Sequence, residues 1–268
     1  MDRILSLAKG HYLGNVVDTF DADGIILSET TYSNDLFTSQ MHCHENLHIS
    51  FVLQGGSIEK RNSKEVERFP GNIEFYHAGE KHQTIQKAYP SKNINLEIDI
   101  AFLKQNQITE AIICKVITQN PEGKFLLLKM YKELMVNDES SIASVNMLFL
   151  DLITKSDNLR PNKSCPAWVK IIRELMNERW NDKLTLHDLA IAANINPITI
   201  SKHFRKYFFC TFGEHMRKLK IDKSLSHLRT GSSSLTQTAY FCNFADQSHF
   251  TRTFKALTGF LPKQYHKL

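Results

Sequence analysis

The spacing of hydrophobic positions changes near the middle of the chain. Up to about residue 102 they form short alternating runs separated by turns, as in 47–53 and 93–100. Beyond that point apolar residues recur every three or four positions, first in 124–136 and 140–153, and then from 167 onward. Alternation is typical of strands, and the longer period is typical of amphipathic helices. The pattern predicts a β-rich first part and a helical second part.

Turn signals and prolines divide the chain further. Close turns between the early strands favour a small antiparallel barrel or jelly roll, with Gly55-Gly56 ending the strand 47–53 and 57–61 returning as a hairpin. Two prolines and polar residues interrupt the helical period at 157–166 and predict a linker. The fold class we expect is α+β with two domains. Its segments are a barrel at 1–102, helices at 103–156, the linker at 157–166 and an all-α domain at 167–268.

The all-α domain contains two helix-turn-helix patterns. In the first, Thr185 can cap a short helix, with Asp188 three residues on in a variant of the capping box. Asn194 can adopt the left-handed conformation of a tight turn. Asn196 followed by Pro197 is the start of a second helix.

The second pattern repeats the first. Residues 234–241 form the short helix, Asn243 lies in the turn, and Asp246 caps the helix 247–257. A longer amphipathic helix at 212–228 joins the two patterns and is long enough to hold them together.

The second pattern resembles the DNA-binding domain of the AraC/XylS family of bacterial transcription regulators. That family usually shows Gly-Phe-x-Asp-x-Ser-x-Phe-x-Arg-x-Phe-Lys, followed by Gly and Pro. From Asn243 this chain reads Asn-Phe-Ala-Asp-Gln-Ser-His-Phe-Thr-Arg-Thr-Phe-Lys, with Gly259 and Pro262 behind it. The resemblance runs from about Trp168 to the C-terminus. Asn243 departs from the family's turn glycine, and Asn tolerates that conformation best among the other residues.

In this family the second helix of each unit enters the major groove, and its outward side chains read bases. Carried over by position, the resemblance implies DNA contacts by Ile198, Thr199, Ser201, Lys202, Arg205, Gln247, Ser248, His249 and Arg252. Phosphate contacts are expected from Arg205, Lys206, Lys218 and Lys255. Two units on one rigid connector should address adjacent major-groove segments about one helical turn, ~34 Å, apart.

Histidines form the other candidate site, in the run His42-Cys43-His44-Glu45-Asn46-Leu47-His48. In a continuous strand His42, His44 and His48 share one face. Neutral imidazole suits zinc, iron, nickel or copper. We therefore expect one divalent transition metal, and the alternative, histidines that line a pocket as hydrogen-bonding groups for a small organic effector, stays open.

The spacing of these histidines resembles the cupin fold. His48 stands at the Glu position of the first cupin motif. Gly71, Gly79 and His82 fit the second motif, in which His77 replaces the proline and is expected to be a turn residue. The resemblance implies a cupin-like barrel with a metal or effector pocket formed by His42, His44, His48 and His82.

Charge separates the two parts of the chain. Residues 167–268 hold 16 Lys and Arg against 7 Asp and Glu, whereas residues 1–166 hold 17 against 21. A basic surplus in the part with paired helix-turn-helix patterns favours phosphate binding. The five scattered cysteines form no CxxC pair, the N-terminus lacks a secretion signal, and no apolar run approaches ~20 residues. We expect a cytoplasmic, nucleoid-associated bacterial protein without membrane contact.

These features predict a sequence-specific DNA-binding transcription regulator, an effector-responsive activator and not an enzyme. Its expected partners are double-stranded DNA, a small-molecule or metal effector, and RNA polymerase if it activates. The helices at 124–136 and 140–153 either pack on the barrel or pair with a second copy, and we favour a homodimer. Two alternatives are a metal-dependent cupin enzyme fused to a DNA-binding domain, and a constitutive DNA-binding protein with a structural barrel.

Overall fold

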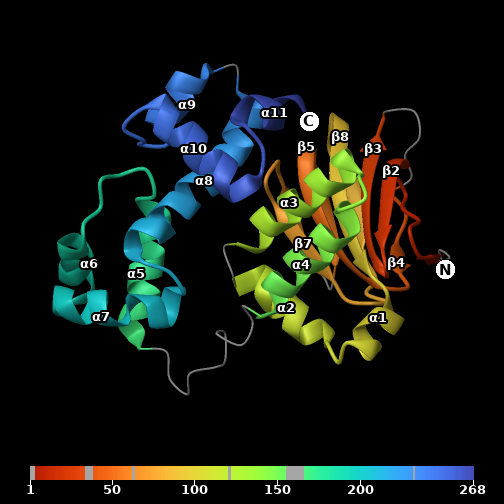
Figure 1. The fold of residues 1–268 in the computed structure, drawn as a ribbon, viewed down its shortest axis with the longest axis horizontal. Coiled ribbons are helices and arrows are strands. Elements are labelled where there is room, and N and C mark those ends of the chain that lie inside the picture. The colour runs from red at the N-terminus through yellow and green to blue at the C-terminus, as the bar shows by residue number, and fades with distance from the viewer. Residues whose placement is uncertain (1–3, 34–38, 62–63, 120–121, 155–165, 232) are drawn as a thin grey trace. The chain divides into compact units, whose positions relative to one another are not determined.

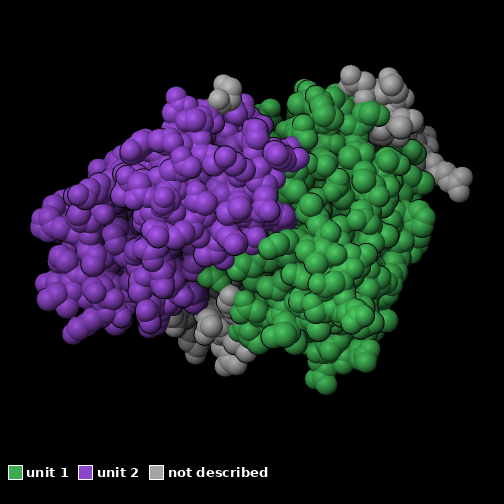
Figure 2. Space-filling model, turned by 45° about the horizontal axis from the view of Figure 1, so that its top comes forward, with its two compact units in different colours: residues 1–156, 268 green, residues 157–267 purple. Residues whose placement is uncertain are grey.

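The computed structural model describes residues 4–33, 39–61, 64–119, 122–154, 166–231 and 233–268. The chain divides into two compact units, residues 1–156 with Leu268, and residues 157–267 (Figure 2). The predicted linker at 157–166 lies outside the described residues except for Pro166. A sheet-rich first part and a helical second part are both present, which confirms the division predicted from hydrophobic spacing.

The first unit begins with strands. Their bounds are β1 Leu5–Leu7, β2 Asn15–Ala22, β3 Ile25–Tyr32, β4 His42–His44, β5 Leu47–Arg61, β6 Lys64–Arg68, β7 Ile73–Tyr76 and β8 Gln83–Ile98. Six of them form an antiparallel sheet in the order β2-β3-β8-β5-β6, with β7 also paired to β5, and β1 pairs with β4 in parallel. The antiparallel arrangement agrees with the expected strand pattern, and closure into a cupin jelly roll stays a prediction.

Helices complete the first unit. They are α1 Ile100–Gln105, α2 Glu110–Gln119, α3 Gly123–Val136 and α4 Ser141–Thr154. Figure 1 shows α3 and α4 lying across one face of the sheet, where α4 contacts β2 and α3 contacts β3. Phe125 and Leu128 of α3 and Val145 and Phe149 of α4 are buried. The apolar stripes read from the sequence therefore cover the sheet, as the packing alternative expected.

The expected turn at Gly55-Gly56 is wrong. β5 continues through both glycines, because β8 runs beside it on either side of them. The pairing with β8 shifts register between Val52 and Ser57, which marks β-bulges. Gly55 has a φ of +81°, and a Cβ there would lie 2.8 Å from the carbonyl oxygen of Ala88. Glycine is thus needed for a bulge within one long strand rather than for a hairpin turn.

The second unit is all α-helical. Its helices are α5 Ala167–Glu178, α6 Leu186–Ala193, α7 Pro197–Phe208, α8 Phe212–Thr230, α9 Leu235–Phe241, α10 Gln247–Thr258 and α11 Pro262–Lys267. The predicted caps are confirmed. Thr185 and Asp188 form a capping box, Asn196 accepts from the Ile198 N–H, and Asp246 accepts from the His249 N–H. Satisfying these amide groups is what starts each helix at its predicted residue.

Candidate nucleic-acid interface and histidine pocket

The helix α7 presents the predicted reading residues of the first pattern. Ile200, Phe204 and Phe208 are buried along one side of it. On the rest of its surface Ser201, Lys202 and Arg205 are exposed, Ile198 is 61% exposed and Thr199 is half-buried. An exposed aliphatic side chain at this position suits contact with a thymine methyl group.

The helix α10 likewise has one buried side and one exposed side. Phe250, Phe254 and Thr258 are buried, while Gln247, Ser248 and Arg252 are exposed and His249 is half-buried. Gln247 Oε1 accepts a hydrogen bond from Thr236 Oγ1 at 2.6 Å, which leaves its amide N–H groups as donors. All nine side chains expected at DNA therefore lie on α7 or α10, on the parts of the two helices that do not form the core.

Cations flank these helices at the positions expected to meet phosphates. Arg205, Lys206 and Lys255 are exposed, and Lys218 of α8 is half-buried. A cleft of about 300 Å³ between α8 and α10 is lined by Arg217, Lys218 and Arg252, with Glu214 as its acidic member. This basic cleft joins the surface of α10 to that of α8.

Lys220 is a residue that sequence reasoning missed. Its Nζ donates to the carbonyl oxygen of Asn243 at 2.9 Å and lies 5.9 Å from the centre of the Phe244 ring. Burial lowers the pKa of Lys220. Lys220 therefore holds the turn that precedes α10. The helical period alone places it on α8 but does not show that α8 passes this turn.

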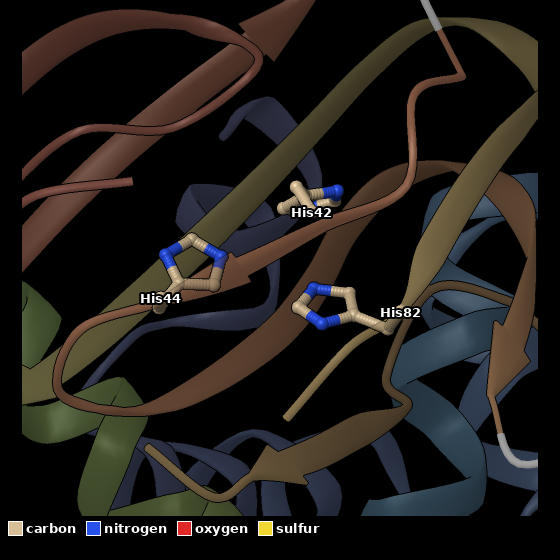
Figure 3. A group of neighbouring side chains, drawn as sticks. All are labelled: His42, His44 and His82. Carbon is tan, nitrogen blue, oxygen red and sulfur yellow. The ribbon is translucent and has the colours of Figure 1, made fainter. Parts of the chain in front are cut away.

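Three of the four candidate histidines lie together in the first unit. His42 and His44 come from β4, and His82 pairs with His42 across an isolated bridge ahead of β8. One ligand atom of each of the three lies within 4.8 Å of the others. Figure 3 shows their rings around a common space. We call these residues the histidine triad.

Hydrogen bonds fix the protons of two of these rings. His42 Nδ1 donates to the carbonyl oxygen of Gln40 and His82 Nδ1 donates to that of Glu80, each at 2.9 Å. A carbonyl oxygen can only accept, so each Nδ1 carries the proton and each Nε2 keeps a lone pair. Backbone carbonyls bonded to the other ring nitrogen are the usual support of metal-binding histidines. The residues present therefore fit a transition-metal ion.

His48 lies beside the triad and is held differently. A bend at residues 45–46 separates β4 from β5, so His48 does not lie on the same strand as His42 and His44. Asn95 Nδ2 donates to Thr30 Oγ1, and Asn95 Oδ1 accepts from His48 Nε2 at 3.0 Å. His48 Nε2 thus carries the proton, and the ring of His48 is centred 4.3 Å from that of His44. His48 lines the same hollow as the triad, although its nitrogens are not among the ligand atoms that lie within 4.8 Å of one another.

Burial keeps these histidines uncharged. It lowers the pKa of His42 and of His44, and it lowers the pKa of His48 and His82 to about 3. The neighbouring imidazoles act in the same direction on His44, His48 and His82. Neutral imidazole is the form that binds metals, so the triad needs no deprotonation at neutral pH.

The triad opens into a small hollow of about 30 Å³ whose wall consists mostly of polar side chains. Arg68 is 2% exposed there, and its Nη2 donates to Ser50 O and Oγ at 3.1 Å. Glu59 lies 4.0 Å from Arg68, and burial raises the pKa of Glu59 to about 7. Sequence reasoning missed this pair, because alternating charges in a strand usually indicate a solvent-facing edge. Other side chains on the wall of the hollow are Tyr12, Tyr32, Tyr76, Asn93 and Asn95.

Comparisons with known proteins address the helical unit most directly. Residues 189–267 match the model of a family described as a helix-turn-helix domain. A protein named as an uncharacterised HTH-type transcriptional regulator, YdeC of Bacillus subtilis, is 18% identical over 85% of this chain and 86% of its own length. The HTH-type transcriptional activator RhaS of Escherichia coli is 22% identical over 52% of this chain and 51% of its own.

Two further matches are weaker, one in the share of the chain that it covers and the other in structural similarity. AdaA of Bacillus subtilis, named as a bifunctional transcriptional activator and DNA repair enzyme, is 24% identical over 41% of this chain and 57% of its own. The solved structure of ToxT from Vibrio cholerae covers 91% of this chain and 98% of its own, at 13% identity and a TM-score of 0.37. A score of this size does not establish a shared fold. The chain thus spans most of YdeC but only about half of RhaS and AdaA.

The class of protein follows from the fold, the exposed helices and these relatives. The chain is a DNA-binding transcription regulator, and residues 189–267 of its C-terminal unit form a helix-turn-helix domain. The resemblance to AraC/XylS regulators lies in these same residues. Among the described residues, no helix is long and apolar enough to cross a membrane.

Proposed function

We propose that the protein reads two successive major-groove segments with α7 and α10. The observation that carries this proposal is their matched construction. Each helix begins at a side-chain cap, buries Phe204 or Phe254 at the same position, and exposes a cation two residues before it, Lys202 or Arg252. If only one helix read DNA, the other would not need the same cap, buried Phe and exposed cation.

Single substitutions test the two helices separately. Arg252→Ala and Lys202→Ala should each weaken binding to a specific duplex by about 1–3 kcal/mol, the range of a lost base contact. Lys170→Ala is the control, because Lys170 is an exposed cation on α5. Fluorescence anisotropy at one salt concentration measures the affinities of the wild type and the three variants. Equal affinity of Arg252→Ala and wild type would remove α10 from the interface.

We further propose that the hollow of the first unit binds the effector, with a divalent transition metal held by His42, His44 and His82. Support comes from the paired Nδ1–H bonds, the free Nε2 atoms and the low pKa values of the rings. Zinc, iron, nickel or copper suits such nitrogen ligands. The metal would act as the effector itself or orient an organic effector against Arg68 and the tyrosines. An effector can shift the DNA-binding state only by its difference in affinity for the two states.

Elemental mass spectrometry of protein purified without chelator or a metal-affinity tag tests the metal. We expect one ion per chain in the wild type and its loss in His44→Ala. His77→Ala should keep the ion, because His77 lies in a turn and bonds to Glu110 at 2.8 Å. No metal in the wild type would leave an organic effector as the remaining proposal for the hollow.

We also propose that the protein is a homodimeric activator that contacts RNA polymerase. The support for a dimer is the outer side of α4, where Met147 is 71%, Leu150 56% and Ile142 42% exposed. The inner side of the same helix is buried on the first unit, so α4 is apolar on both sides. An apolar surface of this kind favours association.

A further inference from the structure

The two halves of the C-terminal unit have separate cores joined by α8. The core of the first half gathers buried residues of α5, α6 and α7 with Met216 near the start of α8. Further along α8, Ile221, Leu225 and Leu228 are buried, and α9, α10 and α11 pack against this helix. Long helices curve and flex, so a fixed separation of α7 and α10 is better secured by a second contact between the halves.

An aromatic cluster provides that second contact. Trp180 lies in the turn after α5, and its ring is centred 5.5 Å from that of Phe241 at the end of α9, with 65° between the planes. His227 of α8 stacks on Phe241 with centres 4.3 Å apart and an angle of 14°. Both arrangements are among those that aromatic rings prefer. We call Trp180, His227 and Phe241 the aromatic clamp, because they join the first half, α8 and the second half.

The turn that carries Trp180 is itself fixed. Arg179 Nε donates to Asp182 Oδ2 at 2.7 Å, and the Asp182 N–H donates to the carbonyl oxygen of Arg179 at 3.1 Å. These bonds close the turn around Trp180. Because the turn is ordered, contact with Trp180 can hold α9 at a fixed place relative to α5 and α6. A side chain on a loose loop could not do so.

We propose that the aromatic clamp sets the separation of α7 and α10, and thereby the spacing of the two DNA segments that the protein accepts. The proposal rests on DNA binding by both helices. Trp180, His227 and Phe241 are positioning residues, since none lies on α7 or α10. Without the clamp α8 still joins the halves, and the protein tolerates a wider range of spacings.

A spacing series tests the clamp. The duplex is one selected by the wild-type protein from random DNA, and its variants carry one or two added base pairs between the two contacted segments. One added pair turns the second segment by about 34°. We expect the wild type to lose about 20-fold or more in affinity on this insertion, because the base contacts of one helix are lost.

Phe241→Ala should bind the selected duplex about five-fold more weakly, as expected for a lost aromatic pair. It should lose less than about three-fold on the insertion, because the halves can then adjust. Tyr240→Ala is the matched control, since Tyr240 is the preceding residue of α9 and is 62% exposed. On insertion of one base pair it should lose as much affinity as the wild type does; we call this loss the spacing penalty.

The outcomes separate the two proposals. If the wild type selects no DNA, the proposed function fails. If the wild type binds and Phe241→Ala keeps the full spacing penalty, α8 alone sets the separation and the clamp proposal is wrong. Circular dichroism verifies that Phe241→Ala is folded. Should it not fold, Trp180→Ala removes the same contact from the other half and is scored by the same penalty.

Discussion

At the scale of single residues, backbone conformation explains two of the sequence choices in the turns. Asn194 and Asn243 have φ values of +50° and +51° in equivalent turns of the two patterns. Asparagine adopts the left-handed region more readily than other residues that carry a Cβ. Asn243 stands where the AraC/XylS motif has glycine, and its φ of +51° is one that glycine also adopts readily.

Substitution of Asn194 tests this explanation. Asn194→Ala should destabilise the protein by about 1 kcal/mol, because alanine lacks the short polar side chain that favours this conformation. Asn194→Gly should stay within about 0.5 kcal/mol of the wild type, since glycine adopts positive φ freely. Urea unfolding followed by circular dichroism measures both. A larger loss for glycine than for alanine would contradict the conformational account.

Buried histidines make the stability of the fold depend on pH. His215 of α8 packs against Phe204 and Phe208, and burial lowers its pKa to about 4. An unfolded histidine has a pKa near 6.5, so the unfolded state binds more protons below that value. The stability contributed by a neutral buried ring is therefore present above about pH 6.5 and is lost as the pH falls toward 4.

Between pH 7 and pH 5 this effect should cost about 2 kcal/mol per buried histidine of this kind. Denaturant unfolding at the two pH values measures the loss. His215→Leu keeps an apolar side chain between Phe204 and Phe208, and it should lose about 2 kcal/mol less than the wild type over the same interval. An identical loss in the variant would show that His215 is not buried neutral.

At the scale of elements, local signals predicted the helical unit well. Thr185, Asn196 and Asp246 are capping residues, so each helix start can be read from a few neighbouring positions. The β-rich unit was predicted less completely. The bulges at Gly55 depend on β8, more than thirty residues along the chain. Burial of Arg68 likewise depends on strands that are distant in sequence.

Some features of the histidines could be predicted from local sequence, and others depend on residues that are distant in sequence. The motif spacing identified His42, His44 and His82, which the fold brings together. It also named His48, whose Nε2 donates to Asn95, a residue that no local pattern connects with it, and whose Nδ1 has no hydrogen-bond partner in the described structure. Periodicity shows which face a residue shares with its neighbours, and only the assembled sheet shows which nitrogen remains free.

The outer side of α4 gives a prediction at the scale of elements. Met147→Glu and Leu150→Glu together should convert the proposed dimer to a monomer, because both side chains are more than half exposed and would place like charges in the contact. Sedimentation velocity at micromolar concentration measures the change. Asp151→Glu is a control that keeps the charge of this side. A wild-type protein that is already monomeric would remove α4 from the proposed interface.

At the scale of the whole molecule, the net charge changes sign along the sequence where the β-containing unit ends and the all-helical unit begins. The basic surplus lies in residues 167–268, which hold both recognition helices, while the acidic surplus lies in the part with the histidine triad. The proposed phosphate contacts therefore lie in one unit and the proposed effector hollow in the other. Screening by salt should therefore weaken DNA binding much more than metal binding.

The central claim is that α7 and α10 read two DNA segments on one face of the double helix. Selection of duplexes from a random library by the full-length protein, followed by sequencing, tests this claim most directly. We expect two enriched segments with centres about 10 base pairs apart, the spacing of successive major grooves on one face. Enrichment of a single segment would contradict reading by both helices, and no enrichment would contradict sequence-specific binding.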